Sequence, residues 1–431
     1  MRSRLHGGAC LVGLAFMPLL AMAQPSPAGR GTPAAGRGGA CTVRCNFDKR
    51  MVESQPIDTR PTQLEGDHPV FAGQTRAPYH KTVDVNVTTV TKNLDNPFAV
   101  AQLPSGRILV TEKPGRIRIL NKDGSNYDTI TDLPPITVRG QVGLLDIVVD
   151  PKFVSNHRVF FTYMARIDAN NSAMAVASGV LNEVKGQLSD VETIFKTAPY
   201  ANSTAVNAGS RIAISPKDGS LFVIIGDRST GDPVWQMAQR TDNYLGKLIH
   251  ITADGKPAPG NPPLGLPEIY TLGHRSEQGL AFAPDGRLWE VEDGPRGGDE
   301  LNLMKPGLNY GWPVITHGIN YPGTKIGDGS VEKPGLEQPR YYWDPAIAPS
   351  GFAFYTGKLF PQWRKSVLVG SLAAQYLSRL ELSKDDKVVN EEPLLTDFNQ
   401  RIRDVRVFRD GAVYVLTDGA NAQLLKLTPK T

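Results

Sequence analysis

Residues 284–291 read Pro-Asp-Gly-Arg-Leu-Trp-Glu-Val, which is a glycine-containing turn followed by a short apolar segment. The same arrangement recurs at residues 103–111, 216–224 and 409–416. A turn that leads into a short alternating segment is typical of a β-hairpin with a half-buried strand. The gaps between these turns are close to multiples of about 60 residues, which indicates a long structural repeat.

Two further segments, residues 150–163 and 366–371, occupy the missing positions of the repeat and bring it to six units. Long segments with a clean helical period are lacking. The sequence therefore predicts an all-β fold, a six-bladed β-propeller, and the alternative is an array of β-sandwiches. A propeller binds its ligand over the central channel, so the chemistry should lie in loops.

The composition sets limits on the class of protein. The 431 residues include 43 Gly and 34 Pro, which is rich in turns but below the level typical of disordered chains. The net charge of +4 argues against nucleic-acid binding, which requires a basic stripe. Three cysteines exclude a dense disulfide scaffold and a four-cysteine zinc site.

Residues 1–23 have the features of a signal peptide. Arg2 and Arg4 form a basic region, residues 11–20 are apolar, and residues 21–23 (Ala-Met-Ala) form a cleavage motif. The apolar run is short for a membrane span, and an uncleaved anchor is the alternative. We expect a soluble, periplasmic or secreted protein with no transmembrane segment after leader removal.

Residues 24–85 are expected to form a linker and an irregular extension ahead of the propeller at residues 86–431. The first part of this segment is rich in Ala, Pro and Gly. Cys41 and Cys45 are expected to form a small local disulfide after export.

The densest polar motif is residues 292–302, Glu-Asp-Gly-Pro-Arg-Gly-Gly-Asp-Glu-Leu-Asn. Its Gly and Pro residues bend the backbone and expose carbonyl groups, while Asp293, Asp299 and Glu300 supply carboxylates. Oxygen-rich loops of this kind suit a hard cation such as Ca²⁺, and a solvated acidic turn is the alternative.

Arg401 and Arg403 lie on one face if their segment is extended. Two guanidinium groups on one face suit a ligand with several carboxylates, although a surface ion-pair network is the commoner role of such a pair.

Four further polar residues have competing interpretations. His274 and His317 lie in loop motifs and are candidates for a base, but a single histidine is more often structural. Asp146 and Asp150 are interpreted as turn or capping groups.

Together with Gly140-Gln-Val-Gly-Leu-Leu145, Leu272–Gly279 and Asn309-Tyr-Gly-Trp-Pro313, these motifs resemble the soluble glucose/sorbosone dehydrogenase family. The resemblance covers about residues 90–428. Members of that family are six-bladed propellers that bind pyrroloquinoline quinone (PQQ) and Ca²⁺ and oxidise aldose sugars. The resemblance therefore implies a PQQ- and calcium-dependent oxidoreductase for an aldose or related polyol, with an external electron acceptor.

The resemblance implies roles for individual residues. Gln141 is expected beside the sugar. Cofactor binding is expected from a set of arginines: Arg401, Arg403, Arg275 and Arg211.

Two calcium sites are also implied. The backbone carbonyls of Gly294 and Pro295 are expected to hold the Ca²⁺ that bridges to PQQ. Glu300 and the carbonyl of Tyr310 match a further Ca²⁺ site of the family.

Three positions depart from the family pattern. Asn207 stands where the family has its general base, a histidine, and Asn cannot accept a proton at neutral pH. Ala373 replaces a lysine that contacts the quinone, and Ser276 replaces an asparagine. Asp293 is the candidate for a substitute base or an additional metal ligand. The alternatives are a catalytically impaired sugar-binding propeller and a calcium-dependent lactonase-like hydrolase.

Overall fold

The computed structural model describes residues 51–201, 205–229 and 231–430. The predicted signal peptide and the predicted disulfide between Cys41 and Cys45 lie outside the described residues. None of the helices within these ranges is long and apolar enough to cross a membrane.

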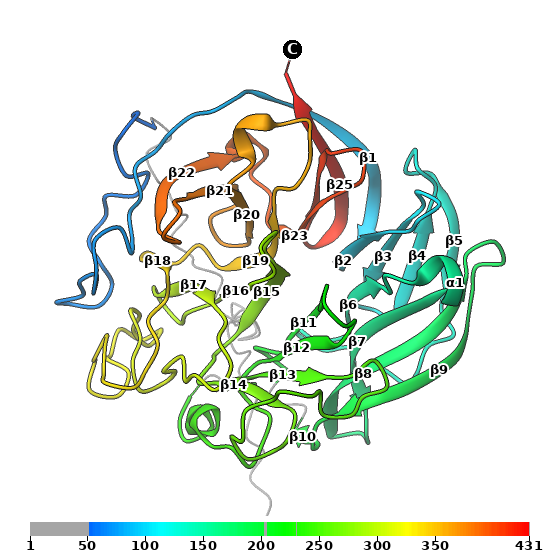
Figure 1. Ribbon diagram of the computed structural model, residues 1–431, viewed down its shortest axis with the longest axis horizontal. Helices are drawn as coiled ribbons and strands as arrows, with labels where there is room; N and C mark the ends of the chain where they lie inside the picture. Colours follow the sequence, from blue (N-terminus) through cyan, green and yellow to red (C-terminus); the bar gives the residue numbers. More distant parts are fainter. Residues whose placement is uncertain (1–50, 202–204, 230, 431) are drawn as a thin grey trace, which may run out of the picture. The chain divides into compact units, whose positions relative to one another are not determined.

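Six antiparallel sheets surround a central channel, so the predicted six-bladed β-propeller is confirmed (Figure 1). Each sheet is one blade, and the first strand of each blade lines the channel. Blade 1 contains β2 (Pro97–Gln102), β3 (Ile108–Glu112), β4 (Arg116–Leu120) and β5 (Asn126–Ile130). Blade 2 contains β6 (Leu144–Val149), β7 (Arg158–Arg166), β8 (Asn171–Asn182), β9 (Gln187–Lys196) and β10 (Tyr200–Ala201). Blade 3 contains β11 (Gly209–Ile214), β12 (Leu221–Ile225), β13 (Lys247–Ile251) and β14 (Ile269–Leu272).

The second half of the ring has the same construction. Blade 4 contains β15 (Glu277–Phe282), β16 (Leu288–Glu292), β17 (Asp299–Leu303) and β18 (Tyr341–Trp343). Blade 5 contains β19 (Pro349–Phe354), β20 (Ser366–Ser371), β21 (Leu377–Leu382) and β22 (Val388–Leu394). Blade 6 contains β23 (Ile402–Val407), β24 (Val413–Thr417), β25 (Ala420–Pro429) and β1 (Val85–Asp95). The described helices are short, with three to six residues each: α1 (Phe153–Asn156), η2 (Val234–Gln239), η3 (Pro361–Trp363) and η4 (Thr396–Phe398).

Both ends of the propeller sequence meet in blade 6. The register pairs Val85 of β1 with Pro429 of β25, so the first strand of the propeller completes its last sheet. This closure joins the two ends of the ring by backbone hydrogen bonds and leaves no gap between the first and last blades.

The four repeated turns each connect the innermost strand of a blade to its second strand. Gly106 and Gly286 illustrate why glycine is required, because their φ angles of 91° and 84° lie in the left-handed region. The second strands β3, β12, β16, β20 and β24 are buried along their whole length. Neighbouring blades cover both faces of these strands, which explains the apolar runs in the sequence.

Residues 51–84 form the expected irregular extension, which contains isolated bridges but no helix or extended strand. The extension contacts blades 4 and 5. Tyr79 forms a bridge with Glu391, and Arg76 Nη2 donates to the carbonyl of Asp344 at 3.0 Å.

Candidate active site

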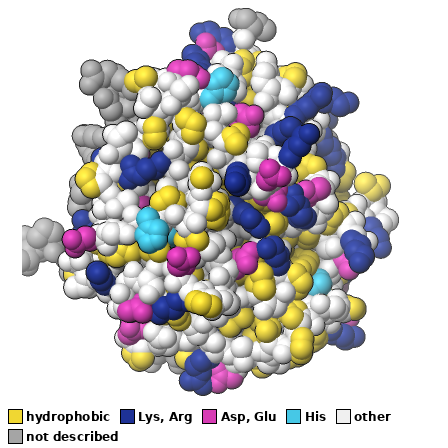
Figure 2. Space-filling view, turned by 60° about the vertical axis from the view of Figure 1, so that its left-hand side comes forward, with side chains coloured by type: hydrophobic (Ala, Val, Ile, Leu, Met, Phe, Trp, Pro, Cys, Tyr) yellow, Lys and Arg dark blue, Asp and Glu magenta, His cyan; other side chains and the backbone are white. Residues whose placement is uncertain are grey.

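The predicted site residues lie at one end of the channel in two kinds of segment. Gln141, Asn207, Arg275 and Arg401 precede the innermost strands β6, β11, β15 and β23, whereas residues 293–295 follow the second strand β16. On the face shown in Figure 2, Lys and Arg side chains lie beside Asp and Glu side chains.

Arg401 and Arg403 form a clamp at the start of β23. Their Nε atoms donate to the two oxygens of one carboxylate, Asp418, at 2.9 and 3.0 Å. Burial alone would raise the pKa of Asp418. The charges of Arg403 and Arg401 nevertheless hold this pKa well below its ordinary value. Among the described residues, the terminal nitrogens of Arg403 have no hydrogen-bond partner, so they remain available to a ligand.

Asn207 lies directly beside Gln141. The Asn207 backbone N–H donates to Gln141 Oε1 at 2.8 Å, which brings the expected sugar-contacting residue and the base position together. Asn207 Nδ2 donates to Asp227 Oδ1 at 3.0 Å and to the carbonyl of Ser229 at 2.9 Å. The Asn207 side-chain amide therefore acts as a double donor in the position of the family's base.

Asp227 is a buried carboxylate that sequence reasoning missed. It also accepts a hydrogen bond from Trp312 Nε1 at 2.9 Å. Burial raises the pKa of Asp227 to about 6. The charge of Arg275 and the hydrogen bonds that Asp227 accepts act in the opposite direction. A buried acid next to Asn207 is therefore poised to change charge near neutral pH.

The 293–299 loop is held from both sides. Asp299 accepts hydrogen bonds from the backbone N–H groups of Gly294, Ile347 and Ala348, at 2.8, 2.6 and 2.7 Å. Arg275 Nη1 donates to the carbonyls of Asp293 and Gly294, both at 2.8 Å. The backbone that was expected to bind calcium is therefore fixed in place.

Asp293 completes the loop with an unsatisfied carboxylate. The residue is partly exposed, but its Oδ1 atom is shielded from solvent and has no hydrogen-bond partner. Burial, followed by the nearby Asp299 charge, raises the pKa of Asp293 well above its ordinary value. A shielded carboxylate oxygen without a partner is unfavourable unless a proton or a cation satisfies it.

A small cavity of about 10 Å³ lies beside this loop, lined by Asp293, Gly294, Glu300 and Tyr310 among others. This volume accommodates roughly one water-sized or ion-sized particle. Ca²⁺ prefers the oxygen atoms of carboxylates and backbone carbonyls as ligands. The cavity is lined by residues that offer both, so these residues fit a calcium ion.

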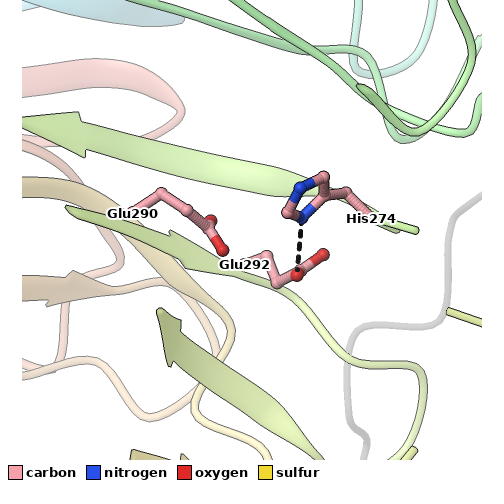
Figure 3. A group of neighbouring side chains, drawn as sticks. All are labelled: His274, Glu290 and Glu292. Atoms are coloured by element: carbon pink, nitrogen blue, oxygen red, sulfur yellow. Dashed lines mark hydrogen bonds and ion pairs between the residues drawn. The ribbon is translucent and has the colours of Figure 1, made fainter. Parts of the chain in front are cut away.

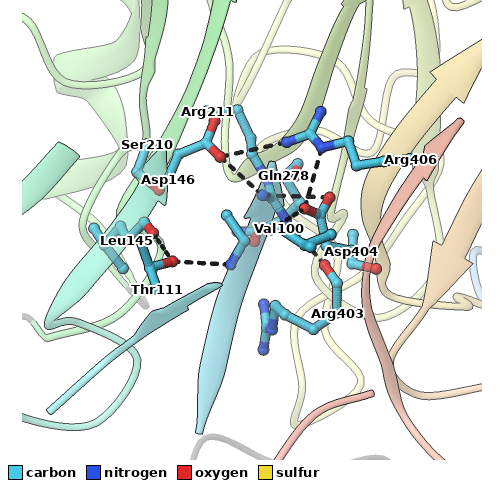
Figure 4. Close-up of polar contacts among 12 residues, drawn as sticks. Val100, Thr111, Leu145, Asp146, Ser210, Arg211, Gln278, Arg403, Asp404 and Arg406 are labelled. Atoms are coloured by element: carbon cyan, nitrogen blue, oxygen red, sulfur yellow. Dashed lines mark hydrogen bonds and ion pairs between the residues drawn. The ribbon is translucent and has the colours of Figure 1, made fainter. Parts of the chain in front are cut away.

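Arg211 lies deeper in the channel (Figure 4). It is 2% exposed, and its Nη1 lies 3.2 Å from Asp146 and 3.4 Å from Asp404. Its Nη2 donates to the carbonyl of Arg403 at 2.9 Å. Arg211, on β11, therefore connects β6 and β23 and holds the backbone of Arg403 in place. Its contact with a cofactor stays a prediction.

The remaining polar candidates are also placed by the structure. Asp146 belongs to the channel ion-pair network and is neither a turn group nor a cap. Asp150 is a turn group, which accepts from the N–H of Lys152 at 2.8 Å. His317 is buried, and its Nδ1 lies 2.8 Å from Asp67 of the extension.

Ala373 lies next to the clamp, because the carbonyl of the preceding Leu372 accepts from Arg401 Nη1 at 3.2 Å. Lys113, which sequence reasoning missed, brings an ammonium group to the same region. Burial, followed by the Arg403 charge, lowers the pKa of Lys113. Lys113 and Asp418 each directly follow the second strand of a blade, as Asp293 does. Their position in the repeat was therefore the sequence signal that could have identified them as site residues.

The fold is therefore a six-bladed propeller, and charged side chains lie over one end of its channel. The chain belongs to the glucose/sorbosone dehydrogenase family, whose model matches residues 94–426. The resemblance inferred from the motifs is therefore confirmed.

Several relatives share most of the chain. Aldose sugar dehydrogenase YliI of Escherichia coli (strain K12) is 37% identical over 353 residues, which cover 80% of this chain and 93% of the relative. The crystal structure of the soluble aldose sugar dehydrogenase from Escherichia coli in its apo form has a TM-score of 0.75 and 35% identity, covering 80% of this chain and all of the other. The PQQ-bound form of an aldose sugar dehydrogenase from Streptomyces coelicolor has a TM-score of 0.67 and 27% identity, covering 81% of this chain and 99% of the other.

Proposed function

We propose that the chain is a PQQ- and calcium-dependent oxidoreductase that oxidises an aldose sugar or a related polyol. The observation that carries the proposal is the clamp, in which Asp418 holds Arg401 and Arg403 side by side. A relative of known structure binds PQQ, which carries several carboxylates and matches paired guanidinium groups.

Each part of the site has a role in this proposal. Arg401 and Arg403 bind the cofactor carboxylates, and Arg275 keeps the Gly294 carbonyl in position. The carbonyls of Gly294 and Pro295 would hold Ca²⁺. When bound, PQQ supplies the acceptor for the hydride of the sugar.

The proton of the sugar hydroxyl requires an acceptor from this chain. Asn207 cannot serve, because an amide does not accept a proton at neutral pH, and its side-chain nitrogen already donates to Asp227 and Ser229. We assign the role to Asp293: burial raises the pKa of its carboxyl well above the ordinary value, as a base near neutral pH requires, while the charges of Arg275, Arg403 and Arg401 act in the opposite direction. Gln141 orients the substrate beside Asn207.

A second candidate is a propeller that binds a sugar but oxidises it slowly or not at all. Asn207 favours this candidate because it removes the customary base. The signal peptide at residues 1–23 supports a periplasmic or secreted location for either function, with electrons passed to an external acceptor in the first.

The test adds PQQ and Ca²⁺ to the metal-free protein and follows the quinone absorbance with a panel of aldoses and an artificial electron acceptor. The proposal expects binding and sugar-dependent reduction. Quinone that binds but is never reduced supports the second candidate. Arg401→Ala should weaken PQQ binding, whereas Arg287→Ala, which removes an exposed arginine paired with Asp285 and Asp386, should not.

A further inference from the structure

A second group of polar side chains is buried between blades 3 and 4. His274 lies in the connection from β14 to β15, and Glu290 and Glu292 lie on β16. Figure 3 shows the imidazole and the two carboxylates turned toward a common space. One ligand atom from each residue lies within 4.8 Å of the others, and all three residues are buried.

The group contains more carboxyl oxygens than its neighbours satisfy. Within the part of the chain that the structure describes, Glu290 Oε2 and both carboxyl oxygens of Glu277 are buried without a hydrogen-bond partner, and Glu277 is 1% exposed. Glu277 Oε1 lies 3.9 Å from His274 Nδ1, so this carboxylate faces the same space. The nearby Lys247 uses its ammonium group on three backbone carbonyls and makes no direct ion pair with Glu277 among the described residues.

The imidazole is oriented as a metal ligand requires. His274 Nε2 lies 2.8 Å from Thr271 Oγ1, which leaves Nδ1 directed at the carboxylates. His274 Nδ1 and Glu292 Oε1 are 3.2 Å apart, close to the separation of about 3.4 Å between two tetrahedral ligands of a zinc-like ion. A hydrogen bond to the second ring nitrogen is the usual support of a metal-bound histidine.

The carboxylates are held as well. Asn302 Nδ2 donates to Glu290 Oε1 at 2.8 Å and lies 3.3 Å from Glu292 Oε1. The His274 ring stacks on Tyr310, with ring centroids 4.8 Å apart. The donor set therefore has a fixed geometry before any ion binds.

We propose that His274, Glu290 and Glu292, completed by Glu277, bind one divalent transition-metal ion of the zinc class. An imidazole nitrogen selects such an ion over Ca²⁺, which takes oxygen ligands. Glu292 lines the same small cavity as Glu300 and Tyr310, and Asn302 Nδ2 also donates to Glu300 Oε2 at 3.0 Å, so the proposed site adjoins the calcium site expected there. It ties β16 to the loop that carries Arg275, so the ion stabilises one wall of the ligand site.

The test uses the full chain after treatment with chelator and return to saturating Ca²⁺. Co²⁺ is titrated as the probe, and its visible absorption reports a nitrogen ligand. The proposal expects one Co²⁺ for each chain, displaced by Zn²⁺ and retained at millimolar Ca²⁺. Glu290→Gln should weaken Co²⁺ binding by about 100-fold or more, and Glu277→Gln by about 10-fold.

Thermal unfolding gives a second readout. Glu290→Gln should abolish the increase in the midpoint of thermal unfolding that Zn²⁺ produces, because it removes one ligand of the ion. Glu391→Gln is the matched control, because Glu391 is a buried glutamate of blade 5 that accepts from Ser378 and Trp343, and it should keep Co²⁺ binding within a few-fold. The proposal is overturned if no Co²⁺ binds, if Ca²⁺ displaces it, or if Glu391→Gln abolishes binding as completely as Glu290→Gln.

Discussion

Replacing Asn207 by histidine should increase sugar oxidation. Asp227 Oδ1 already lies 3.0 Å from Asn207 Nδ2, so an imidazole N–H can take over this hydrogen bond and leave its second nitrogen as a proton acceptor. The backbone permits the change, because residue 207 has a φ of 44° and His, like Asn, is enriched in the left-handed region.

The size of the effect follows from the role of a general base. A positioned base contributes about 10²–10⁴-fold, which corresponds to about 3–5 kcal/mol of barrier. If Asp293 already accepts the proton in the natural chain, the gain falls toward the lower end. Because the pKa of Asp227 is raised to about 6, its carboxylate is ionised above that pH, and the gain should appear as pH rises through 6.

The assay measures kcat/KM with PQQ, Ca²⁺ and an artificial acceptor between pH 5 and 8. Asn207→Ala is the control, because it removes the same hydrogen bonds without adding an acceptor. Asp227→Asn in the Asn207→His background should lose most of the gain. The reasoning fails if Asn207→His binds PQQ normally but is no faster than the natural chain at any pH in this range.

The remaining predictions concern binding and stability. Asp418→Asn should weaken PQQ binding by about 10–100-fold without changing the fold, since it releases both clamp arginines; unchanged affinity in a PQQ titration would contradict this role. Arg211→Met should lower the free energy of unfolding in urea by about 3–5 kcal/mol, because it removes the buried guanidinium group between Asp146 and Asp404 and leaves these carboxylates only Arg406 as an ion-pair partner among the described residues, whereas Arg287→Met should cost less than about 1 kcal/mol. A loss below 1 kcal/mol for Arg211→Met would show that the buried network is not required. Burial raises the pKa of Asp227 to about 6 and that of Asp299 to about 7, so the folded state holds these protons more tightly than the unfolded chain. Their contribution to the stability of the metal-free protein should therefore fall as pH rises from about 4 to 7. Urea unfolding at several pH values measures this dependence. The prediction is contradicted if Asp227→Asn leaves the slope of the unfolding free energy against pH unchanged.

The fold could be predicted because its signals are local. A turn such as the one at Gly286 and the apolar strand after it repeat with one spacing, and both depend only on neighbouring residues. The clamp pair was predictable for the same reason, since Arg401 and Arg403 are two residues apart on one strand.

The partners of the site residues could not be predicted in this way. Asp418, Asp227 and Asp404 come from different loops or strands than the residues they bind, and only the closed ring brings them together. The sequence could not show that Arg211 is deeply buried or that its Nη2 donates to the carbonyl of Arg403, because a motif records neither burial nor partners; its contact with a cofactor stays a prediction.

The central claim is that the clamp and the 293–299 loop bind PQQ with Ca²⁺ for sugar oxidation. The most direct measurement is a spectrophotometric titration of the metal-free protein with PQQ in the presence of Ca²⁺, followed by addition of an aldose. We predict one PQQ for each chain, loss of binding when Ca²⁺ is withheld, and reduction of the bound quinone by sugar. Failure to bind PQQ at saturating Ca²⁺, or binding that Arg401→Ala and Arg403→Ala leave unchanged, would contradict the claim.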